Sequence, residues 1–406
     1  MEDKKKAIII SGIAIILFGI IVGFSFVNKS KEKNLNNQGT GNIVINDSIS
    51  HDLKNNKFDE AIVKIKDLLE DDADNIDLLL AKAEVLLVKG SHKFEEEENA
   101  VKAQEILLVV LEKDPENAKA YRLMGYSYEI QNMFEDALLN YNTALTFEET
   151  ADTYNWIGHT FDLKGQTDVA EEFYDKAYEI DDSNRTVMRN LARIYMNTDR
   201  MANARKILEK IIKLPVDNIS AVAGDYHSLG VIDFENQDID KSKISFEKAL
   251  KIDPSFMLSQ VELEKNKILF TNDKEDAIIN LIKISKNYPK QVFPVEWLGF
   301  AYLEINEFDN AIKTFDKAIE LIEGDITLMP QQRIIIRSRL NYYLSISQAL
   351  NGQTEKSKEH LLKAMEGMNE TTMAMIVIAL QKGKDGPYKN MIHDKDIVEM
   401  INSLNK

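Results

Sequence analysis

The segment YRLMGYSYEIQNMFEDALLNYNTAL, residues 121–145, recurs as YNWIGHTFDLKGQTDVAEEFYDKAY at 154–178 and as VEWLGFAYLEINEFDNAIKTFDKAI at 295–319. In each copy a Gly is followed by an Ala after twelve residues, by an aromatic residue after four more and by another Ala after three more. The sets are Gly125/Ala137/Tyr141/Ala144, Gly158/Ala170/Tyr174/Ala177 and Gly299/Ala311/Phe315/Ala318. This shared spacing decides the fold.

The spacing predicts that each copy is a pair of short amphipathic helices joined by a tight turn. Apolar residues at i, i+3, i+4 and i+7 form one buried stripe on each helix. Small residues stand where the two helices must approach closely, and the predicted turns carry Gly165, Gln131–Asn132 and Asn306–Glu307. One pair cannot bury its stripe alone, so neighbouring pairs must stack.

Weaker copies extend the array in both directions. A fourth set is Gly230/Ser242/Phe246/Ala249, and two degenerate copies contain Ala192 and Lys265. Residues 57–75 resemble the second half of a unit, 77–111 a unit with a polar insert, and 330–365 a final unit with a lengthened first helix. We therefore expect about nine units, with imperfect ones at the ends.

The repeated pattern resembles the tetratricopeptide repeat family. The resemblance implies an all-α solenoid of helix-turn-helix units. We expect this solenoid to occupy residues 49–366 and C-terminal capping helices to occupy 367–406. In the capping segment, apolar residues at helical spacing would cover the exposed stripe of the last unit, and a partner-binding tail is the alternative.

The N-terminal segment predicts a membrane anchor. Residues 7–27, AIIISGIAIILFGIIVGFSFV, contain no charged residue, and a helix of that length spans about 30 Å, the thickness of a bilayer core. We therefore expect a tail and transmembrane helix at 1–28 and a flexible linker at 29–48. A cleaved signal peptide is the alternative, although no A-x-A-like site follows. Lysines are equal in number on both sides, and the short lysine-rich tail favours repeats on the extracytoplasmic side.

The amino-acid composition argues against several classes of function. A net charge of −17 argues against nucleic acid as a partner, because such binding depends on Lys and Arg that neutralise phosphates. The chain has no Cys, which excludes disulfides and Cys-ligated metals. Its six His lie far apart, and no glycine-rich phosphate-binding motif is present. We therefore expect no metal, no cofactor, no small-molecule substrate and no enzymatic activity.

The resemblance also implies where a ligand binds. In the family, ligands lie along the concave groove formed by the first helix of each unit, at positions that share one helical face. The candidate groove residues are Lys119, Arg122, Tyr126, Asn155, His159, Arg189, Arg193, His227, Asn266 and Phe300. The C-terminal half of the groove is more apolar, and it either grips hydrophobic side chains of a ligand or closes against the last helices.

The basic members of this set predict recognition of an extended peptide or a C-terminal carboxylate through charge-assisted hydrogen bonds. Chaperone-binding members of the family use a similar clamp, but Tyr126 stands where that clamp has Asn. In the alternative interpretation, the arginines pair with Asp152, Asp162 or Glu129 and merely solvate the groove.

The leading hypothesis for function is a membrane-anchored scaffold or chaperone-like adaptor that binds a peptide segment of a partner protein. A constitutive structural subunit of a membrane or envelope assembly is the alternative. An enzyme with a dispersed active site is a third hypothesis, which open solenoids rarely support.

Overall fold

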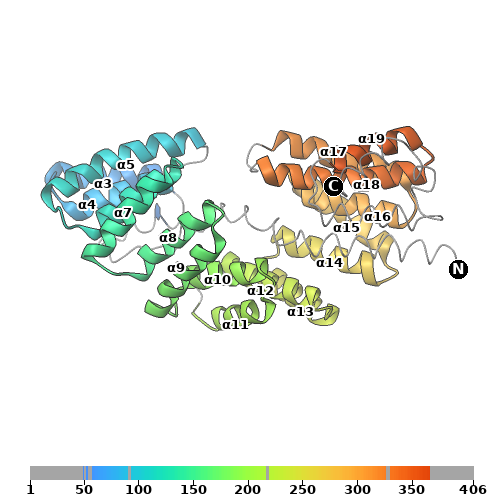
Figure 1. Ribbon diagram of the computed structural model, residues 1–406, viewed down its shortest axis with the longest axis horizontal. Coiled ribbons are helices and arrows are strands. Elements are labelled where there is room, and N and C mark those ends of the chain that lie inside the picture. Colours follow the sequence, from blue (N-terminus) through green and yellow to red (C-terminus); the bar gives the residue numbers. More distant parts are fainter. Residues whose placement is uncertain are drawn as a thin grey trace, which may run out of the picture. The chain divides into compact units, whose positions relative to one another are not determined.

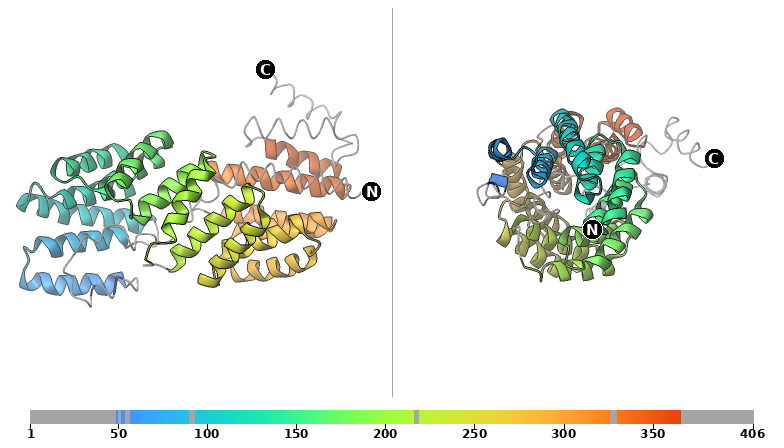
Figure 2. Two further views of the ribbon diagram at one scale, coloured as in Figure 1. Left: turned by 90° about the horizontal axis from the view of Figure 1, so that it is seen from below. Right: turned by 90° about the vertical axis from the view of Figure 1, so that its left-hand side faces the viewer.

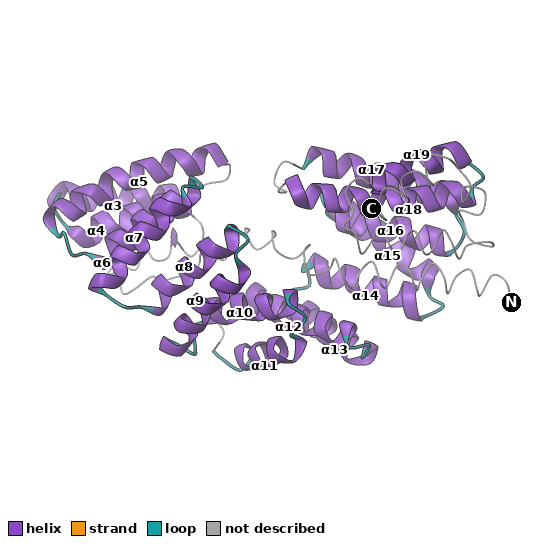
Figure 3. Ribbon diagram, in the orientation of Figure 1, coloured by secondary structure: helices purple, strands orange, loops and turns teal. Residues whose placement is uncertain are grey.

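The computed structural model describes residues 49, 52–53, 57–89, 93–215, 219–325 and 330–365. Apart from short helical fragments at 49 and 52–53, these residues form seventeen α-helices, α3–α19, and no strand (Figures 1 and 3). The helices fall into two compact units, which we call the N-terminal unit (α3–α11, ending at Pro215) and the C-terminal unit (α12–α19). The sequence indicated one continuous array and gave no sign of this subdivision.

The N-terminal unit consists of α3 followed by four helix pairs. Its helices are α3 (Phe58–Asp71), α4 (Ile76–Val88), α5 (Lys93–Lys113), α6 (Ala118–Ile130), α7 (Phe134–Phe147), α8 (Ala151–Leu163), α9 (Thr167–Ile180), α10 (Arg185–Asn197) and α11 (Met201–Ile211). The two helices of each pair pack side by side (Figures 1 and 2). The polar insert predicted after α4 is largely part of α5, whose first turn carries Glu95 and Glu96.

The C-terminal unit consists of four further pairs. Its helices are α12 (Ile219–Glu235), α13 (Ile239–Ile252), α14 (Met257–Phe270), α15 (Lys274–Asn287), α16 (Val292–Glu304), α17 (Phe308–Gly324), α18 (Pro330–Leu350) and α19 (Thr354–Met365). The lengthened first helix predicted for the last unit is α18, and it begins at Pro330 as expected. Eight pairs and the half unit α3 agree with the expectation of about nine units.

Side-chain caps fix the starts of the first helices in the N-terminal unit. Asn75, Asn117, Thr150 and Asn184 precede α4, α6, α8 and α10, and each side chain accepts a hydrogen bond from a backbone N–H of the first turn. A cap of this kind contributes about 1 kcal/mol. The caps therefore set where each repeat begins.

The turns inside the pairs share one backbone conformation. In six pairs, the second residue after the first helix has a positive φ: Asn132, Gly165, Asp199, Gln237, Asn306 and Gly352. The predicted turns at Asn132, Gly165 and Asn306 are confirmed. Those at Asp199 and Gln237 were not anticipated, because Asp and particularly Gln are poorer signals for a left-handed turn than Gly or Asn.

The glycines of the repeat stand where the two helices of a pair touch. A Cβ atom added to Gly125, Gly158, Gly230 or Gly299 would lie 2.6, 2.9, 2.5 or 2.7 Å from the ring of the aromatic residue sixteen positions later. Those rings, Tyr141, Tyr174, Phe246 and Phe315, are fully buried. This confirms that the Gly-to-aromatic spacing of the sequence records a close helix–helix contact.

Several predictions concern residues that the structure does not describe. The proposed anchor at 7–27, the linker at 29–48 and the capping helices at 367–406 all lie outside the described residues. Among the helices that are described, none combines the length and the apolar character needed to cross a membrane.

Candidate functional site

The candidate groove residues belong to two separate sets. Seven of them come from the consecutive first helices α6, α8 and α10 of the N-terminal unit: Lys119, Arg122, Tyr126, Asn155, His159, Arg189 and Arg193. The other three, His227, Asn266 and Phe300, come from α12, α14 and α16 of the C-terminal unit. We call the side of α4, α6, α8 and α10 that carries the first set the N-terminal polar face.

Polar pairs between neighbouring first helices cross this face. Lys119 Nζ of α6 lies 2.9 Å from Glu84 Oε2 of α4. Asn190 Nδ2 of α10 donates to Asn155 Oδ1 of α8 over 2.9 Å. Such contacts tie each repeat to the next through side chains, in addition to the packing of the helices themselves.

His159 and Glu129 form the central pair. His159 Nδ1 of α8 donates to Glu129 Oε1 of α6 over 2.9 Å, and Thr160 Oγ1 donates to Glu129 Oε2 over 2.7 Å. Burial by itself lowers the pKa of His159, but the Glu129 carboxylate and, more weakly, Asp162 outweigh it, so the pKa is raised. The imidazole side chain remains 37% exposed, whereas the carboxylate is buried. The polar face thus holds a histidine whose positive form is favoured.

Arg193 is already paired inside the protein. Its Nη2 donates to Asp162 Oδ2 over 2.6 Å and its Nη1 to Asp162 Oδ1 over 3.4 Å. This contact joins α10 to α8 and agrees with the alternative interpretation, in which the arginines neutralise acidic neighbours. Arg189, on the same helix, is half-buried.

Arg122 and Tyr126 differ in how strongly their side chains are engaged by contacts inside the protein. In the part of the chain that the structure describes, the Arg122 guanidinium makes one hydrogen bond, a long one of 3.5 Å to Thr150 Oγ1. The Tyr126 ring packs against Trp156 with a centroid separation of 4.4 Å, and burial raises the pKa of its hydroxyl. Arg122 therefore retains hydrogen-bond donors for a ligand, while Tyr126 mainly supports the aromatic packing behind it.

The three candidates of the C-terminal unit are packed in its interior. His227 Nδ1 lies 3.0 Å from Ser259 Oγ, and the ring contacts Phe246 and Phe256. Burial, with the nearby Lys265 ammonium, lowers the pKa of His227 to about 3. Asn266 is buried and donates to Ser242 over 3.4 Å, and Phe300 is fully buried against Trp297. These side chains do not line an open groove. They belong to the core, and the contact of Phe300 with Tyr343 of α18 agrees with the alternative that this half closes against the last helices.

Two buried ion pairs of the C-terminal unit were missed by sequence reasoning. Arg339 of α18 donates from Nε and Nη2 to the two oxygens of Glu296 of α16, over 2.5 and 2.8 Å. Lys265 Nζ lies 2.8 Å from Glu262 Oε2 and 3.8 Å from the centre of the Phe234 ring. The second pair could have been suspected from the sequence, because Lys265 stands at the repeat position where well-formed copies have Gly.

Comparisons with known proteins support the repeat assignment. Models described as tetratricopeptide repeat match residues 163–224, 226–256 and 296–325. A relative from Guillardia theta, described as uncharacterized protein ycf37, is 28% identical over 124 residues, which are 28% of this chain and 70% of the relative. A ycf37 protein from Pyropia yezoensis is 31% identical over 71 residues, which are 18% of this chain and 40% of the relative.

A solved structure described as the APC/C hetero-tetramer Cut9–Hcn1 shares the fold. It has a TM-score of 0.51 and 16% sequence identity, and the match covers 71% of this chain and 52% of that chain. This chain therefore spans about half of that protein and less than half of the Pyropia relative. The repeat spacing, the helix-pair geometry and the family models agree: the described residues form an all-α array of helix pairs, and the segments 163–224, 226–256 and 296–325 match tetratricopeptide repeats.

Proposed function

We propose that this chain is a non-catalytic protein-interaction module that holds an extended segment of a partner protein against the N-terminal polar face. Tetratricopeptide repeat proteins are generally scaffolds that bind protein or peptide partners, which supports this class of function. We further propose that residues 7–27 anchor the module in a membrane, with the repeats on the extracytoplasmic side. Such an anchor would restrict the search for partners to the membrane plane and so raise their effective concentration.

The observation that carries the proposal is the series of internal pairs on the polar face. Glu84–Lys119, Glu129–His159 and Asp162–Arg193 join four consecutive first helices without help from a ligand. A surface whose side chains are already fixed loses little conformational entropy when a partner binds. The internal pairs therefore favour a preorganised binding surface.

Within this surface, Arg122 is the side chain best placed to contact a ligand. Its guanidinium has five N–H donors, and one long hydrogen bond to Thr150 engages it among the described residues. Charge-assisted bonds to a carboxylate or to backbone carbonyls of a partner would use the remaining donors. His159 and Arg193, in contrast, would have to exchange internal partners before binding.

The proposal is tested by placing a photo-crosslinking amino acid at Arg122 of the full chain in living cells. The matched control carries it at Leu139, which is 65% exposed on the second helix α7 of the same pair. Adducts are identified by mass spectrometry. We expect one dominant protein, or a family of related segments, at position 122 and not at 139.

The other outcomes separate the alternatives. A broad set of unrelated adducts at 122 indicates a chaperone-like holdase. Equal labelling at 122 and 139 overturns the proposal and favours a permanent subunit of a larger assembly, with both faces covered. Adducts that are exclusively cytoplasmic proteins overturn the proposed topology and leave the polar-face proposal intact.

A further inference from the structure

Two consecutive second helices of the C-terminal unit, α13 and α15, carry the same side chains at their exposed repeat positions. Two residues after the small residue of the repeat, Ser242 in α13 and Ala277 in α15, each helix has an Ile, which is followed by Lys four and seven residues later. All six residues are exposed, the two Ile by 50% and 65%. We call this set the Ile–Lys surface: Ile244, Lys248 and Lys251 of α13 with Ile279, Lys283 and Lys286 of α15.

This combination of residues distinguishes α13 and α15 from the other described second helices. In α17, which follows α15 in the series, the equivalent residues are Lys313, Lys317 and Glu320. In α7 the apolar residue is present as Leu139, which is 65% exposed, but two Thr stand where α13 and α15 have Lys. An exposed apolar residue with two lysines beside it is therefore a local feature and not a general property of the repeat.

The lysines of the Ile–Lys surface have no ion pair with any acidic side chain of the described residues. Lys248 Nζ lies 5.6 Å from the centre of the Tyr226 ring, and this ring contact leaves its charge uncompensated. Elsewhere in the same unit, Lys274 Nζ lies 2.7 Å from Glu304 Oε2. The four ammonium groups are therefore available to an anionic group from outside the chain.

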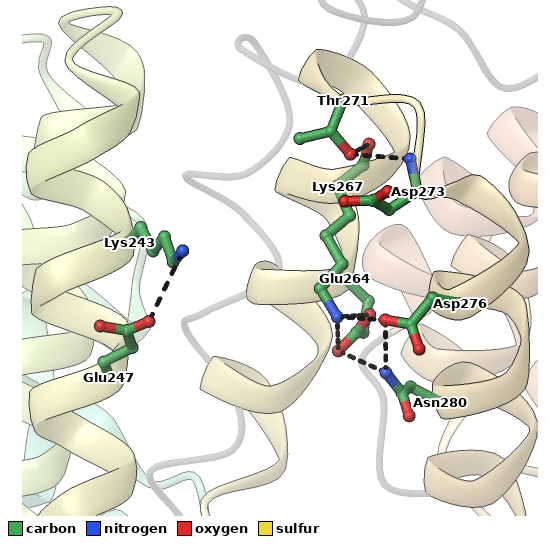
Figure 4. A network of polar contacts seen from close by, with 8 residues as sticks. All are labelled: Lys243, Glu247, Glu264, Lys267, Thr271, Asp273, Asp276 and Asn280. Carbon is green, nitrogen blue, oxygen red and sulfur yellow. Dashed lines mark hydrogen bonds and ion pairs between the residues drawn. The ribbon is translucent and has the colours of Figure 1, made fainter.

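Two nearby acidic residues already have partners of their own (Figure 4). Glu247 Oε1 on α13 lies 3.9 Å from Lys243 Nζ, and Glu264 Oε2 on α14 lies 3.0 Å from Lys267 Nζ. They do not neutralise the surface lysines. The Ile–Lys surface is thus positively charged, although the chain as a whole has a net charge of −17.

A groove between α13 and α15 places the two halves of the surface on either side of it. Its lining includes Leu250 of α13 and Lys283 and Ile284 of α15. Leu250 and Ile284 differ by one residue in their repeat positions, so equivalent positions of the two helices face each other across the groove. Since an α-helix rises 1.5 Å per residue, the lysines lie about 6 and 10 Å along each helix from the Ile. The surface therefore consists of an apolar band beside a basic band.

We propose that the Ile–Lys surface binds an acidic amphipathic helix of a partner protein, which lies across α13 and α15. A helix is about 10 Å wide, so one flank would cover the Ile band and the other the Lys band. Its apolar residues would pack on Ile244 and Ile279, and its Asp or Glu side chains would accept charge-assisted hydrogen bonds from the lysines. This proposal concerns a different surface from the N-terminal polar face and does not rest on the function proposed for that face.

The separation of the two bands favours a protein helix over an anionic membrane as the occupant. A bilayer presents its headgroups and acyl chains uniformly along its plane, so binding to it gives no reason to gather the Ile at one end and the Lys at the other. An amphipathic helix has an apolar flank and a charged flank side by side, which matches the arrangement.

The absence of Cys from the chain permits a direct test, because one introduced Cys is the sole thiol of the protein. Asn287→Cys, at an exposed residue that lines the groove, is labelled with an environment-sensitive dye in the full-length chain. The labelled chain is titrated, in the presence of phosphatidylcholine nanodiscs, with two synthetic peptides of equal composition in Leu, Glu and Ala. One peptide places Leu at i, i+3, i+4 and i+7 with Glu on the adjacent flank, and the other is a scrambled version.

We expect the amphipathic peptide to shift the dye emission and the scrambled peptide to leave it unchanged. Lys283→Glu combined with Lys286→Glu should weaken the affinity about tenfold or more, because each change removes an ion pair and adds a repulsion. The matched control, Lys313→Glu with Lys317→Glu on α17, changes the net charge equally and should alter the affinity less than about twofold.

The apolar band is tested with a second matched pair. Ile279→Ser should weaken the affinity about fivefold through the loss of buried apolar area, and Leu139→Ser, at an equally exposed side chain of α7, should not change it. Thermal melting monitored by circular dichroism establishes that all variants are folded.

Three results would overturn the proposal. The first is a dye emission that the amphipathic peptide does not shift. The second is an equal effect of the α15 and α17 charge reversals, which would show only the general attraction between lysines and an acidic peptide. The third is a dye shift in nanodiscs that contain phosphatidylglycerol without any peptide, lost in the α15 variant, which would assign the surface to an anionic membrane.

Discussion

The two units of this chain use the same interaction at different depths. In the N-terminal unit, Asp162 and Arg193 join α8 to α10 with side chains that are 17% and 21% exposed. In the C-terminal unit, Glu296 and Arg339 join α16 to α18 with side chains that are 1% and 5% exposed. Water reaches the first pair in part, so its contribution to stability is expected to be smaller than that of the second. The second pair is desolvated, so that removal of either partner is expected to have a large effect.

The largest expected effect is that of Glu296→Ala. The buried guanidinium of Arg339 then loses its bidentate partner, which typically costs about 3–5 kcal/mol. The chain has two tryptophans, Trp156 in the N-terminal unit and Trp297 in the C-terminal unit. Urea unfolding monitored by Trp297 fluorescence in a Trp156→Phe background measures the loss in the correct unit. A loss below about 1 kcal/mol would show that the pair behaves like an exposed one.

A second comparison concerns the helix contacts, which the two units share. Gly230→Ala would place a Cβ 2.5 Å from the Phe246 ring, and we expect a destabilisation of about 1–3 kcal/mol from overpacking. The matched control is Gly224→Ala on the same helix, where the nearest atom lies 3.9 Å away. There the higher helix propensity of Ala should stabilise by about 0.5–1 kcal/mol. Similar changes in urea midpoint for both variants would contradict the close-contact explanation.

For the partly buried pair of the N-terminal unit, Asp162→Ala should cost less than Glu296→Ala, about 1–2 kcal/mol. The loss should also diminish as salt increases, because screening weakens exposed ion pairs. The measurement is urea unfolding followed by Trp156 fluorescence in a Trp297→Phe background, at low and high ionic strength. A salt-independent loss of several kcal/mol would remove the contrast between the two units.

The smallest effect on stability near neutral pH comes from the titration of two histidines. Glu129 raises the pKa of His159, so this contact stabilises the fold below the ordinary His pKa of about 6.5, and the stabilisation disappears as pH rises through the folded value. Burial lowers the pKa of His227 to about 3. Below pH ~6.5 this histidine is protonated in the unfolded chain but stays neutral in the folded protein, so the stability of the fold decreases as the pH falls towards 3. Below pH ~6.5 the two contributions to stability therefore have opposite signs: protonated His159 stabilises the fold and neutral His227 destabilises it.

Nuclear magnetic resonance of selectively labelled imidazoles measures both values, with His159→Gln and His227→Gln for assignment. We expect the His227 signal to remain that of a neutral ring down to about pH 4, while His159 titrates above the ordinary value. Normal titration of His227 near pH 6.5 would mean that its ring is accessible to water.

Sequence reasoning predicted the fold well because the repeat records a local contact. Gly125 and Tyr141 are sixteen residues apart, and the Gly and the aromatic residue of every well-formed copy have the same spacing. This spacing places the two helices of a pair in contact. The pairing of Arg193 with Asp162 was also among the alternatives, because both positions lie on one face of successive first helices. Spacing within and between neighbouring repeats was sufficient for these conclusions.

The depth of burial could not be predicted in the same way. Periodicity assigns Phe300 and His159 to the same face, but whether a face stays open depends on what packs over it. The charges of α14 could have been recognised, since Glu264 stands where the other copies have an apolar residue.

The turn shared by six helix pairs bears on how the repeats of this chain can be recognised. Its left-handed residue is Gly twice, Asn twice, Asp once and Gln once, and the pair α14–α15 has none in its described turn, where Thr271 Oγ1 accepts a hydrogen bond from Asp273 N–H. The copies therefore differ in residue identity while the loop between their helices keeps its length. Repeats in this chain are thus recognised by the number of residues between positions rather than by the residues themselves.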